Sequence, residues 1–166
     1  MTHDVEPRQT MNGGGRDTRF MTEALREAET ALARGDVPVG ALVVRDEEVL
    51  ARSSNLKTTD PTAHAEIRAI REAAERVGRW NLKDCDLFVT LEPCPMCAGA
   101  CVNARLRDVV FGAWNSKTGA AGTLYNILRD TRLNHRCGVR GGVMEDMCAA
   151  PLMEYFKRKR IEVKRE

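Results

Sequence analysis

The chain has 166 residues, of which 43% are hydrophobic, 30% charged and 5% aromatic, and its formal net charge is +2. This length and apolar content predict one domain that buries roughly two thirds of its unfolded surface, which excludes a disordered protein. The longest apolar run, residues 39–44, is strand-sized, so a membrane-spanning helix of ~20 apolar residues is excluded, and the small net charge alone indicates no nucleic-acid partner.

The N-terminal segment differs from the rest of the chain. Residues 1–16 lack apolar periodicity and contain three consecutive glycines, which predicts a flexible tail before one domain over residues 17–166. No apolar stretch follows the first charged residues, so no secretory signal is visible and we expect a cytoplasmic protein. Six cysteines are then expected to be reduced thiols that are buried, bind a metal or act as nucleophiles.

The domain is expected to begin with a helix and a hairpin. Apolar residues at three-and-four spacing predict a helix that Asp17 or Thr18 caps and that ends before Gly35. Residues 39–44 and 48–53 then predict two strands joined by a tight turn.

The following elements alternate between helices and strands. They are a helix over 63–77 ended by Gly78, a strand over 87–91, a helix over 94–104 opened by Pro93, a strand over 108–112, a Gly-rich loop over 116–122 and a helical segment over 145–163. Pro151 interrupts the last segment and costs ~3 kcal/mol inside a helix, so this helix is expected to start or kink there. The alternation predicts a three-layer α/β fold with parallel strand pairs.

Two motifs at predicted helix starts point to a metal site. His64 and Glu66 open one helix, and Cys94 and Cys97 open the next. A Cys-x-x-Cys pair at a helix start places two thiols one turn apart, beside free N–H groups that stabilise thiolates. If both helices start at one sheet edge, His64 joins these thiols, and three protein ligands leave one position of a tetrahedral zinc open, as catalytic zinc sites do.

Glu66 is expected to act beside this metal rather than bind it. Residues two apart do not share a helix face, so His64 and Glu66 can meet only beyond the helix end, where a carboxylate can take up and deliver a proton. Each motif has an ordinary reading: a hydrogen-bonded His64, a first-turn acid at Glu66, and a redox pair or half of a structural zinc site. Their combination favours catalytic zinc.

These motifs lie within a wider pattern that resembles the cytidine-deaminase-like superfamily and, within it, the bacterial tRNA-specific adenosine deaminases. The resemblance covers about residues 19–163. The stretches that carry it are Val37-Pro-Val-Gly40, Asp60-Pro-Thr-Ala-His-Ala-Glu66, Val89-Thr-Leu-Glu-Pro-Cys-Pro-Met-Cys-Ala-Gly99, Val110-Phe-Gly-Ala113, Lys117-Thr-Gly-Ala-Ala-Gly122 and Asn134-His135. The cysteine motif is typical of the whole superfamily, and the last two stretches are typical of the tRNA branch.

The resemblance implies a fold, a reaction and partners. The fold would be an α/β/α sandwich with a central mixed sheet of about five strands. The reaction would be hydrolytic deamination of adenosine to inosine at the tRNA wobble position, with the target base flipped into the pocket. One Zn²⁺ per chain is implied. The partners would be a tRNA anticodon stem-loop and a second copy of the chain, because members of this branch are homodimers.

The resemblance also implies roles for individual residues. The implied set is zinc on His64, Cys94 and Cys97, proton transfer by Glu66, and substrate binding by Asn55, the backbone N–H of Ala65, Asn115 and Lys117. The branch usually has an acid where this chain has Asn115. That residue therefore either lines the nucleotide path with changed contacts or is an ordinary turn residue.

Other readings stay open on the sequence alone. The same chemistry could act on guanine, cytosine or a nucleoside, and a non-catalytic zinc module would need a fourth ligand such as Cys101. The basic residues 157–160 are either a solvated helix face or phosphate contacts, and Tyr155 and Phe156 beside them either stack on a base or pack in the core. We expect His135 to form a local hydrogen bond and Trp80 to be packed.

Overall fold

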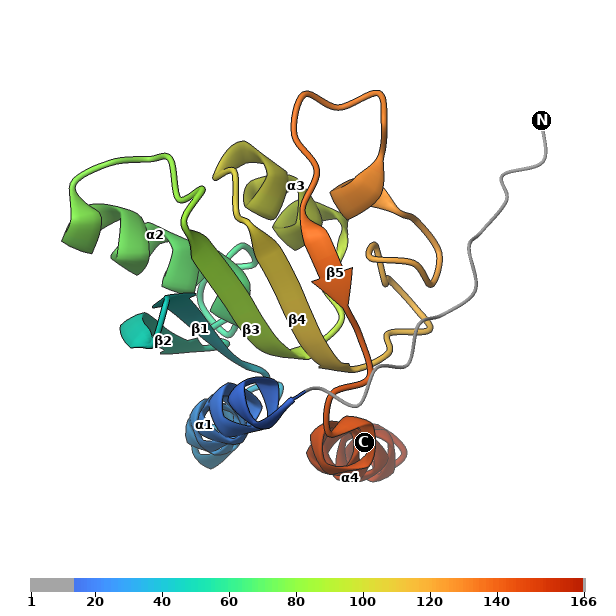
Figure 1. Ribbon diagram of the computed structural model, residues 1–166. Coiled ribbons are helices and arrows are strands. Elements are labelled where there is room, and N and C mark those ends of the chain that lie inside the picture. Colours follow the sequence, from blue (N-terminus) through green and yellow to red (C-terminus); the bar gives the residue numbers. More distant parts are fainter. Residues whose placement is uncertain (1–13, 166) are drawn as a thin grey trace.

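A five-stranded mixed sheet forms the centre of the fold in the computed structural model, which describes residues 14–165 (Figure 1). In spatial order the strands are β2 (Glu48–Ser54), β1 (Gly40–Arg45), β3 (Cys85–Leu91), β4 (Asp108–Ala113) and β5 (Gly138–Arg140). Strand β1 is antiparallel to both β2 and β3, whereas β3, β4 and β5 are parallel. The expected mixed sheet of five strands is therefore confirmed.

Helices cover both faces of this sheet. Figure 1 shows α1 (Gly15–Ala33) and α4 (Glu145–Val163) on one face, and α2 (Ala65–Val77) and α3 (Pro95–Asn103) on the other. A short 3-10 helix, η1 (Ile127–Arg129), packs beside α3. The three-layer prediction is thus correct. No helix within residues 14–165 combines the length and apolar character needed to cross a membrane.

The core follows from the apolar strands in the middle of the sheet. Strands β1, β3 and β4 are buried along almost their whole length, because helices lie on both faces. Helix α1 turns a stripe of buried residues, including Phe20 and Met21, toward the sheet. It approaches β1 so closely that a Cβ at Gly40 would lie 2.0 Å from the carbonyl oxygen of Ala24, so only glycine fits there.

Several strands of the sheet end at the same edge. Because β2, β3 and β4 run in the same direction, their carboxyl ends meet at one edge. Helices α2 and α3 begin at this edge, and the 114–126 loop leaves β4 there. Carboxyl edges of such sheets are where α/β proteins usually bind their ligands.

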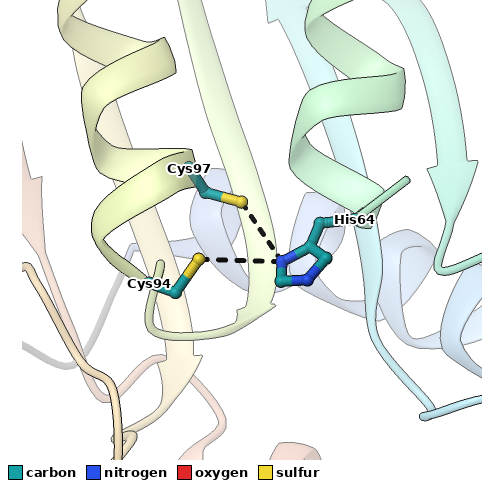
Figure 2. A group of neighbouring side chains, drawn as sticks. All are labelled: His64, Cys94 and Cys97. Atoms are coloured by element: carbon teal, nitrogen blue, oxygen red, sulfur yellow. Dashed lines mark hydrogen bonds between the residues drawn. The ribbon is translucent and has the colours of Figure 1, made fainter. Parts of the chain in front are cut away.

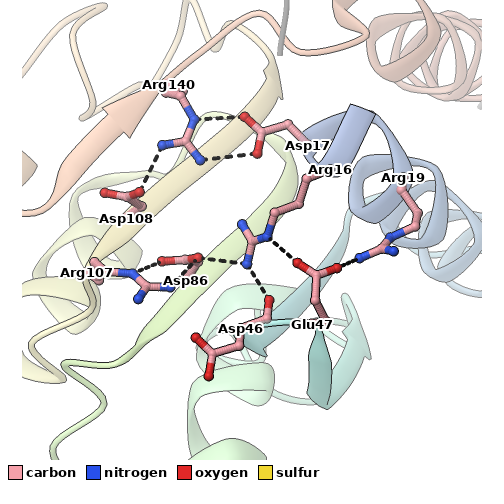
Figure 3. Close-up of polar contacts among 9 residues, drawn as sticks. All are labelled: Arg16, Asp17, Arg19, Asp46, Glu47, Asp86, Arg107, Asp108 and Arg140. Carbon is pink, nitrogen blue, oxygen red and sulfur yellow. Dashed lines mark hydrogen bonds and ion pairs between the residues drawn. The ribbon is translucent and has the colours of Figure 1, made fainter. Parts of the chain in front are cut away.

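The opposite edge carries a cluster of ion pairs, which we call the sheet-edge ion cluster (Figure 3). Its members are Arg16, Asp17, Arg19, Asp46, Glu47, Asp86, Arg107, Asp108 and Arg140, of which Asp46 takes part through its backbone carbonyl, an acceptor for Arg16. Asp86 is 2% exposed and accepts from both Arg16 and Arg107. Arg140 donates to Asp17 at 2.8 Å and to Asp108 at 2.9 Å, which ties α1 to β4 and β5.

This cluster corrects the expected start of the first helix. Helix α1 begins at Gly15, and its N-cap, Gly14, makes no side-chain capping bond. Asp17 is buried and pairs with Arg140, so the cap assigned to Asp17 or Thr18 is wrong. The tail expected over residues 1–16 falls, for residues 1–13, outside the described residues, and the domain boundary stays a prediction.

Three further expectations need correction. Helix α4 starts at Glu145 and continues through Pro151, so the expected start at the proline is wrong, and the expected kink stays a prediction. Trp80 is 65% exposed rather than packed. Strand β5 and η1 had no counterpart among the elements expected from the apolar pattern, because β5 has only three residues and none of them is fully buried.

Candidate metal centre

The three side chains predicted to bind a metal meet at the carboxyl edge of the sheet (Figure 2). His64 is the N-cap of α2, Cys94 is the N-cap of α3, and Cys97 lies in the first turn of α3. The Nδ1 atom of His64 lies 3.7 Å from the Sγ of Cys94 and 3.4 Å from the Sγ of Cys97. The expected meeting of the two helix starts is confirmed.

The donor set fits a zinc ion. One imidazole nitrogen and two thiol sulfurs lie within 4.8 Å of one another, and nitrogen with sulfur is the set that tetrahedral zinc prefers. A hydrogen bond from Cys97, with a further contribution from His64, lowers the pKa of the Cys94 thiol to about 4, although burial opposes this. The site therefore favours a thiolate, the form that binds metal.

No fourth protein ligand joins this set within the described part of the chain. Cys101 is fully buried one turn further along α3, among apolar residues of the core, and burial raises the pKa of its thiol. The reading of a closed structural site with Cys101 as ligand is therefore not supported. A set of three leaves one coordination position for a reactant.

Glu66 lies beside the donors without belonging to their set. Its side chain is 4% exposed in the first turn of α2, and burial raises the pKa of its carboxyl to about 7, while the charge of His64 opposes this. A buried carboxyl with such a raised pKa can exchange a proton near neutral pH, as a general acid–base group must. Its role in the reaction stays a prediction.

A cavity of about 720 Å³ opens at this edge of the sheet. His64, Glu66 and Cys94 line it together with the predicted substrate-binding residues Asn55, Lys117 and Asn115. Ala65 is not part of its wall. The structure therefore brings two of the three predicted donors, His64 and Cys94, and the predicted side-chain contacts into one concave site, which is the usual form of a small-ligand pocket.

Asn55 is fixed at the cavity wall by its neighbours. It is 4% exposed, its Oδ1 accepts from the N–H of Ala65 at 2.8 Å, and its carbonyl accepts from Arg34 at 2.8 Å. The N–H of Ala65 is thus engaged in this structure, and no hydrogen bond within residues 14–165 engages the Nδ2 of Asn55. A substrate contact from this pair would come most directly from Asn55.

Asn115 is both a turn residue and a wall residue. Its Oδ1 accepts from the N–H groups of Lys117 and Thr118, each at 3.1 Å, and its Nδ2 donates to the hydroxyl of Thr118 at 2.8 Å. This arrangement is the Asx-type turn that asparagine favours. Because Asn115 also lines the cavity, the two readings of this residue are compatible.

Several wall residues lie outside the predicted site set, although the sequence leaves Phe156 and the basic residues 157–160 open as RNA contacts. Trp114, Glu92 and, from α4, Phe156, Lys157 and Arg160 all line the cavity. Glu92 is part of the quoted cysteine motif, so its position before Cys94 was the available signal. The α4 residues had only the signal of a basic run beside aromatic residues, because nothing in a sequence shows which helix reaches the far end of a pocket.

The remaining candidates lie apart from the donors. His135 forms a hydrogen bond, as expected: its Nε2 donates to the carbonyl of Leu106 at 2.8 Å. Burial raises the pKa of the thiols of Cys85, Cys137 and Cys148 to about 12, which fits structural thiols. All six cysteines are free.

Comparison with known proteins gives consistent matches. The model of the MafB19-like deaminase family matches residues 16–150. A tRNA-specific adenosine deaminase of Bacillus subtilis (strain 168) is 46% identical over 143 residues, which cover 85% of this chain and 89% of that protein. A solved structure from work on A-to-I editing by tRNA:A34 deaminases at the wobble position of transfer RNA has a TM-score of 0.78 and 43% identity, and covers 81% of this chain and 99% of that one. A guanine deaminase of Bacillus subtilis has a TM-score of 0.56 and 40% identity over 59% of this chain and 64% of its own.

Proposed function

The chain belongs to the MafB19-like deaminase family and, within it, to the tRNA-specific adenosine deaminases, and from this we infer that it converts adenosine to inosine at the wobble position of a tRNA anticodon. The observation that carries the inference is the donor set of His64, Cys94 and Cys97 beside the buried carboxyl of Glu66 at the wall of one cavity. The tRNA deaminases combine identity above 40% with coverage of more than 80% of both chains, whereas the guanine deaminase that is 40% identical covers only 59% of this chain, which favours the tRNA substrate.

One Zn²⁺ per chain would be bound by His64, Cys94 and Cys97. When bound, zinc supplies the Lewis acid that activates water for attack at C6 of adenine, as it does generally in zinc nucleobase deaminases. The three-ligand set is the feature that supports this role, because a structural zinc would fill all four positions with protein atoms.

Glu66 performs the proton transfers in the proposed reaction. Its carboxylate accepts a proton from the attacking water and delivers it to ring nitrogen N1. It then takes the second proton from the new hydroxyl at C6 and delivers it to the C6 amine, so that ammonia leaves and inosine remains. Burial supports this role because it raises the pKa of the carboxyl to about 7, so that both protonation states are populated near neutral pH. The enclosed position also limits competition from bulk water.

The remaining wall residues bind the flipped nucleotide and its flanks. Asn55 presents its Nδ2 group to the purine or its ribose, and Asn115 and Lys117 contact the nucleotide from the 114–126 loop. Lys157 and Arg160 of α4 lie at the same cavity and offer positive charge to the RNA backbone. A target base must leave the stacked loop to reach such a site.

The proposal includes a homodimer in the cytoplasm. Apolar side chains of Met96 on α3 and of Leu124, Tyr125 and Leu133 in the following loops are 38–57% exposed and are candidates for a subunit interface. The six free thiols fit a reducing compartment. Light scattering over a dilution series tests the dimer: a mass of one chain at micromolar concentration would contradict it.

Conversion of an anticodon stem-loop tests the function directly. We expect the zinc-loaded protein to produce inosine in a stem-loop with adenosine at the wobble position, detected by mass spectrometry of the digested RNA, and not in a matched stem-loop with guanosine there. Free adenosine, guanine and cytosine are run in parallel. Turnover of a free base without turnover of the stem-loop would assign the site to a small-molecule deaminase.

A further inference from the structure

Glu92 is a buried acid to which the proposed mechanism gives no role. It lies between the end of β3 and the start of α3, and it is 1% exposed. Its carboxylate accepts four hydrogen bonds, and all four donors belong to the 114–126 loop. They are the N–H groups of Ala121 (3.1 Å) and Thr123 (3.0 Å) to Oε1, and the N–H of Asn115 (2.9 Å) and the hydroxyl of Thr123 (2.5 Å) to Oε2.

Backbone groups on both sides of this carboxylate continue the contact. The N–H of Glu92 donates to the carbonyl of Ala113 at 2.8 Å, and the carbonyl of Pro93 accepts from the N–H of Ala120 at 2.8 Å. The loop also packs directly on the carboxylate, because a Cβ at Gly119 would lie 2.3 Å from Oε2. Glu92 and Pro93, the two residues before Cys94, are thus hydrogen-bonded to several positions along the 114–126 loop.

The chemistry of the partners requires a carboxylate at this position. All four groups are donors, and an ionised carboxylate is the side chain that only accepts. Hydrogen bonds to a charged acceptor are stronger than neutral ones, and they compensate for burying the charge. A glutamine of the same shape would turn an N–H₂ group toward at least one backbone N–H.

The loop in turn contributes the cavity wall that faces the substrate. Asn115 and Lys117 line the cavity, and the Nζ of Lys117 lies 5.7 Å from the ring centre of Phe156 on α4. The loop therefore spans from the start of the metal-binding helix to α4. Because Glu92 is joined by one residue to the thiolate ligand Cys94, it can set the position of this wall relative to the donors.

We propose that Glu92 is a positioning residue that fixes the substrate-binding 114–126 loop against the metal centre, with effects on substrate binding rather than on the chemical step. This rests on the proposed deaminase function. The four donors, the packing of Gly119 and the cavity lining carry it together.

Amide hydrogen exchange on the zinc-loaded protein, measured by NMR, gives a readout that does not depend on activity. Glu92→Gln can keep Oε1 as acceptor for Ala121 and Thr123 and let the Thr123 hydroxyl turn to accept, but its N–H₂ then opposes the N–H of Asn115. We therefore expect the Asn115 amide to lose protection by at least tenfold while those of Ala121 and Thr123 change little. Glu92→Ala should expose all three.

Kinetics on the anticodon stem-loop separate positioning from catalysis. We expect Glu92→Gln to raise KM by about tenfold and to change kcat by less than threefold, with zinc still at one per chain. Thr123→Val removes a single hydroxyl bond and should raise KM by less, which keeps the test available if Glu92 variants fold poorly. Glu48→Gln makes the same chemical change on an exposed residue outside the cavity and should leave KM unchanged.

Two results would overturn the proposal. Parent-like KM and parent-like Asn115 protection in Glu92→Gln would show that the loop does not depend on the carboxylate. Loss of zinc in step with kcat, with the loop amides still protected, would assign Glu92 to the metal-binding helix start. If the parent protein produces no inosine, the proposed function fails, but the exchange pattern still reports on the loop.

Discussion

Single residues at the metal centre make separable contributions to binding and chemistry. Cys94 supplies a thiolate from the N-cap of α3, and a serine there keeps the size but not the soft, charged donor. We expect Cys94→Ser to reduce zinc well below one per chain and to lower thermal stability, because metal binding contributes to the folded state. Metal analysis by mass spectrometry checks this, with Cys148→Ser, a buried cysteine away from the donors, as the control. Full zinc content in Cys94→Ser would remove it from the ligand set.

Glu66 should behave in the opposite way. We expect Glu66→Ala to retain one zinc per chain and to lose at least about 10²–10⁴-fold in deamination rate, the scale of general acid–base catalysis. Single-turnover kinetics and metal analysis on the same sample check this. Glu75→Ala, an exposed change on the same helix, should retain full activity. If zinc is lost with the Glu66 carboxylate, the residue is a ligand and the assigned role is wrong.

Asn115 has a structural role that can be measured without substrate. Aspartate can still accept from the N–H groups of Lys117 and Thr118, whereas alanine removes these bonds and the one to the Thr118 hydroxyl. We expect the free energy of unfolding of Asn115→Asp to stay within ~0.5 kcal/mol of the parent. That of Asn115→Ala should fall by about 1.5–4 kcal/mol, the net value of three such bonds. Denaturant unfolding checks the order. Equal losses in both variants would contradict the turn assignment.

At the level of elements, α4 divides its basic residues between two environments. Lys157 and Arg160 line the cavity, whereas Arg158 pairs with Glu154 and Lys159 with Glu162. The basic residues 157–160 are consecutive in the sequence but divide into two residues that line the cavity and two that form ion pairs on the helix surface. Each pair of residues carries the same charge. Because α4 continues through Pro151, it carries both pairs past the cavity on one helix.

This division predicts different salt dependence for two matched double variants. Lys157→Gln with Arg160→Gln should raise KM for the stem-loop about tenfold near 0.1 M salt and reduce the logarithmic salt slope by about 1.5, since each lost phosphate contact removes roughly 0.7–0.9. Arg158→Gln with Lys159→Gln should change the slope much less. Equal changes in the two double variants would mean that only the net charge of α4 matters.

The elements that the sequence predicted are those with strong local signals. The strands that became β1, β3 and β4 are apolar runs, and the two helix starts carry the ligand motifs. The meeting of the two helix starts then follows from the common direction of the strands that precede them. Strand β5 and the bonds of Glu92 depend on which segments the fold brings together, and no periodicity records that. The helix start predicted at Pro151 was wrong because α4 is stabilised by packing on β3 and β4, which overrides the local cost of a proline.

At the scale of the whole molecule, the two edges of the sheet have different tasks. The carboxyl edge carries the donors and the cavity, while the opposite edge carries the sheet-edge ion cluster (Figure 3). Charges that stabilise the fold are therefore kept away from the surface that must attract RNA. Acidic members of the cluster, such as Asp86, are paired with arginines. Their distance from the cavity and this pairing both weaken any repulsion of the RNA phosphates.

The pairing of Asp17 with Arg140 also has a consequence for how fast the protein folds and unfolds. These residues are 123 positions apart, so nearly the whole chain must be closed into a loop before the pair can form. A contact of this kind is expected to be absent from the folding transition state. Asp17→Asn should therefore leave the refolding rate within twofold of the parent and speed unfolding about tenfold, as stopped-flow denaturant jumps would measure. A slower refolding rate would instead place the docking of α1 onto β5 early, and the lifetime of the native state would then depend on other contacts.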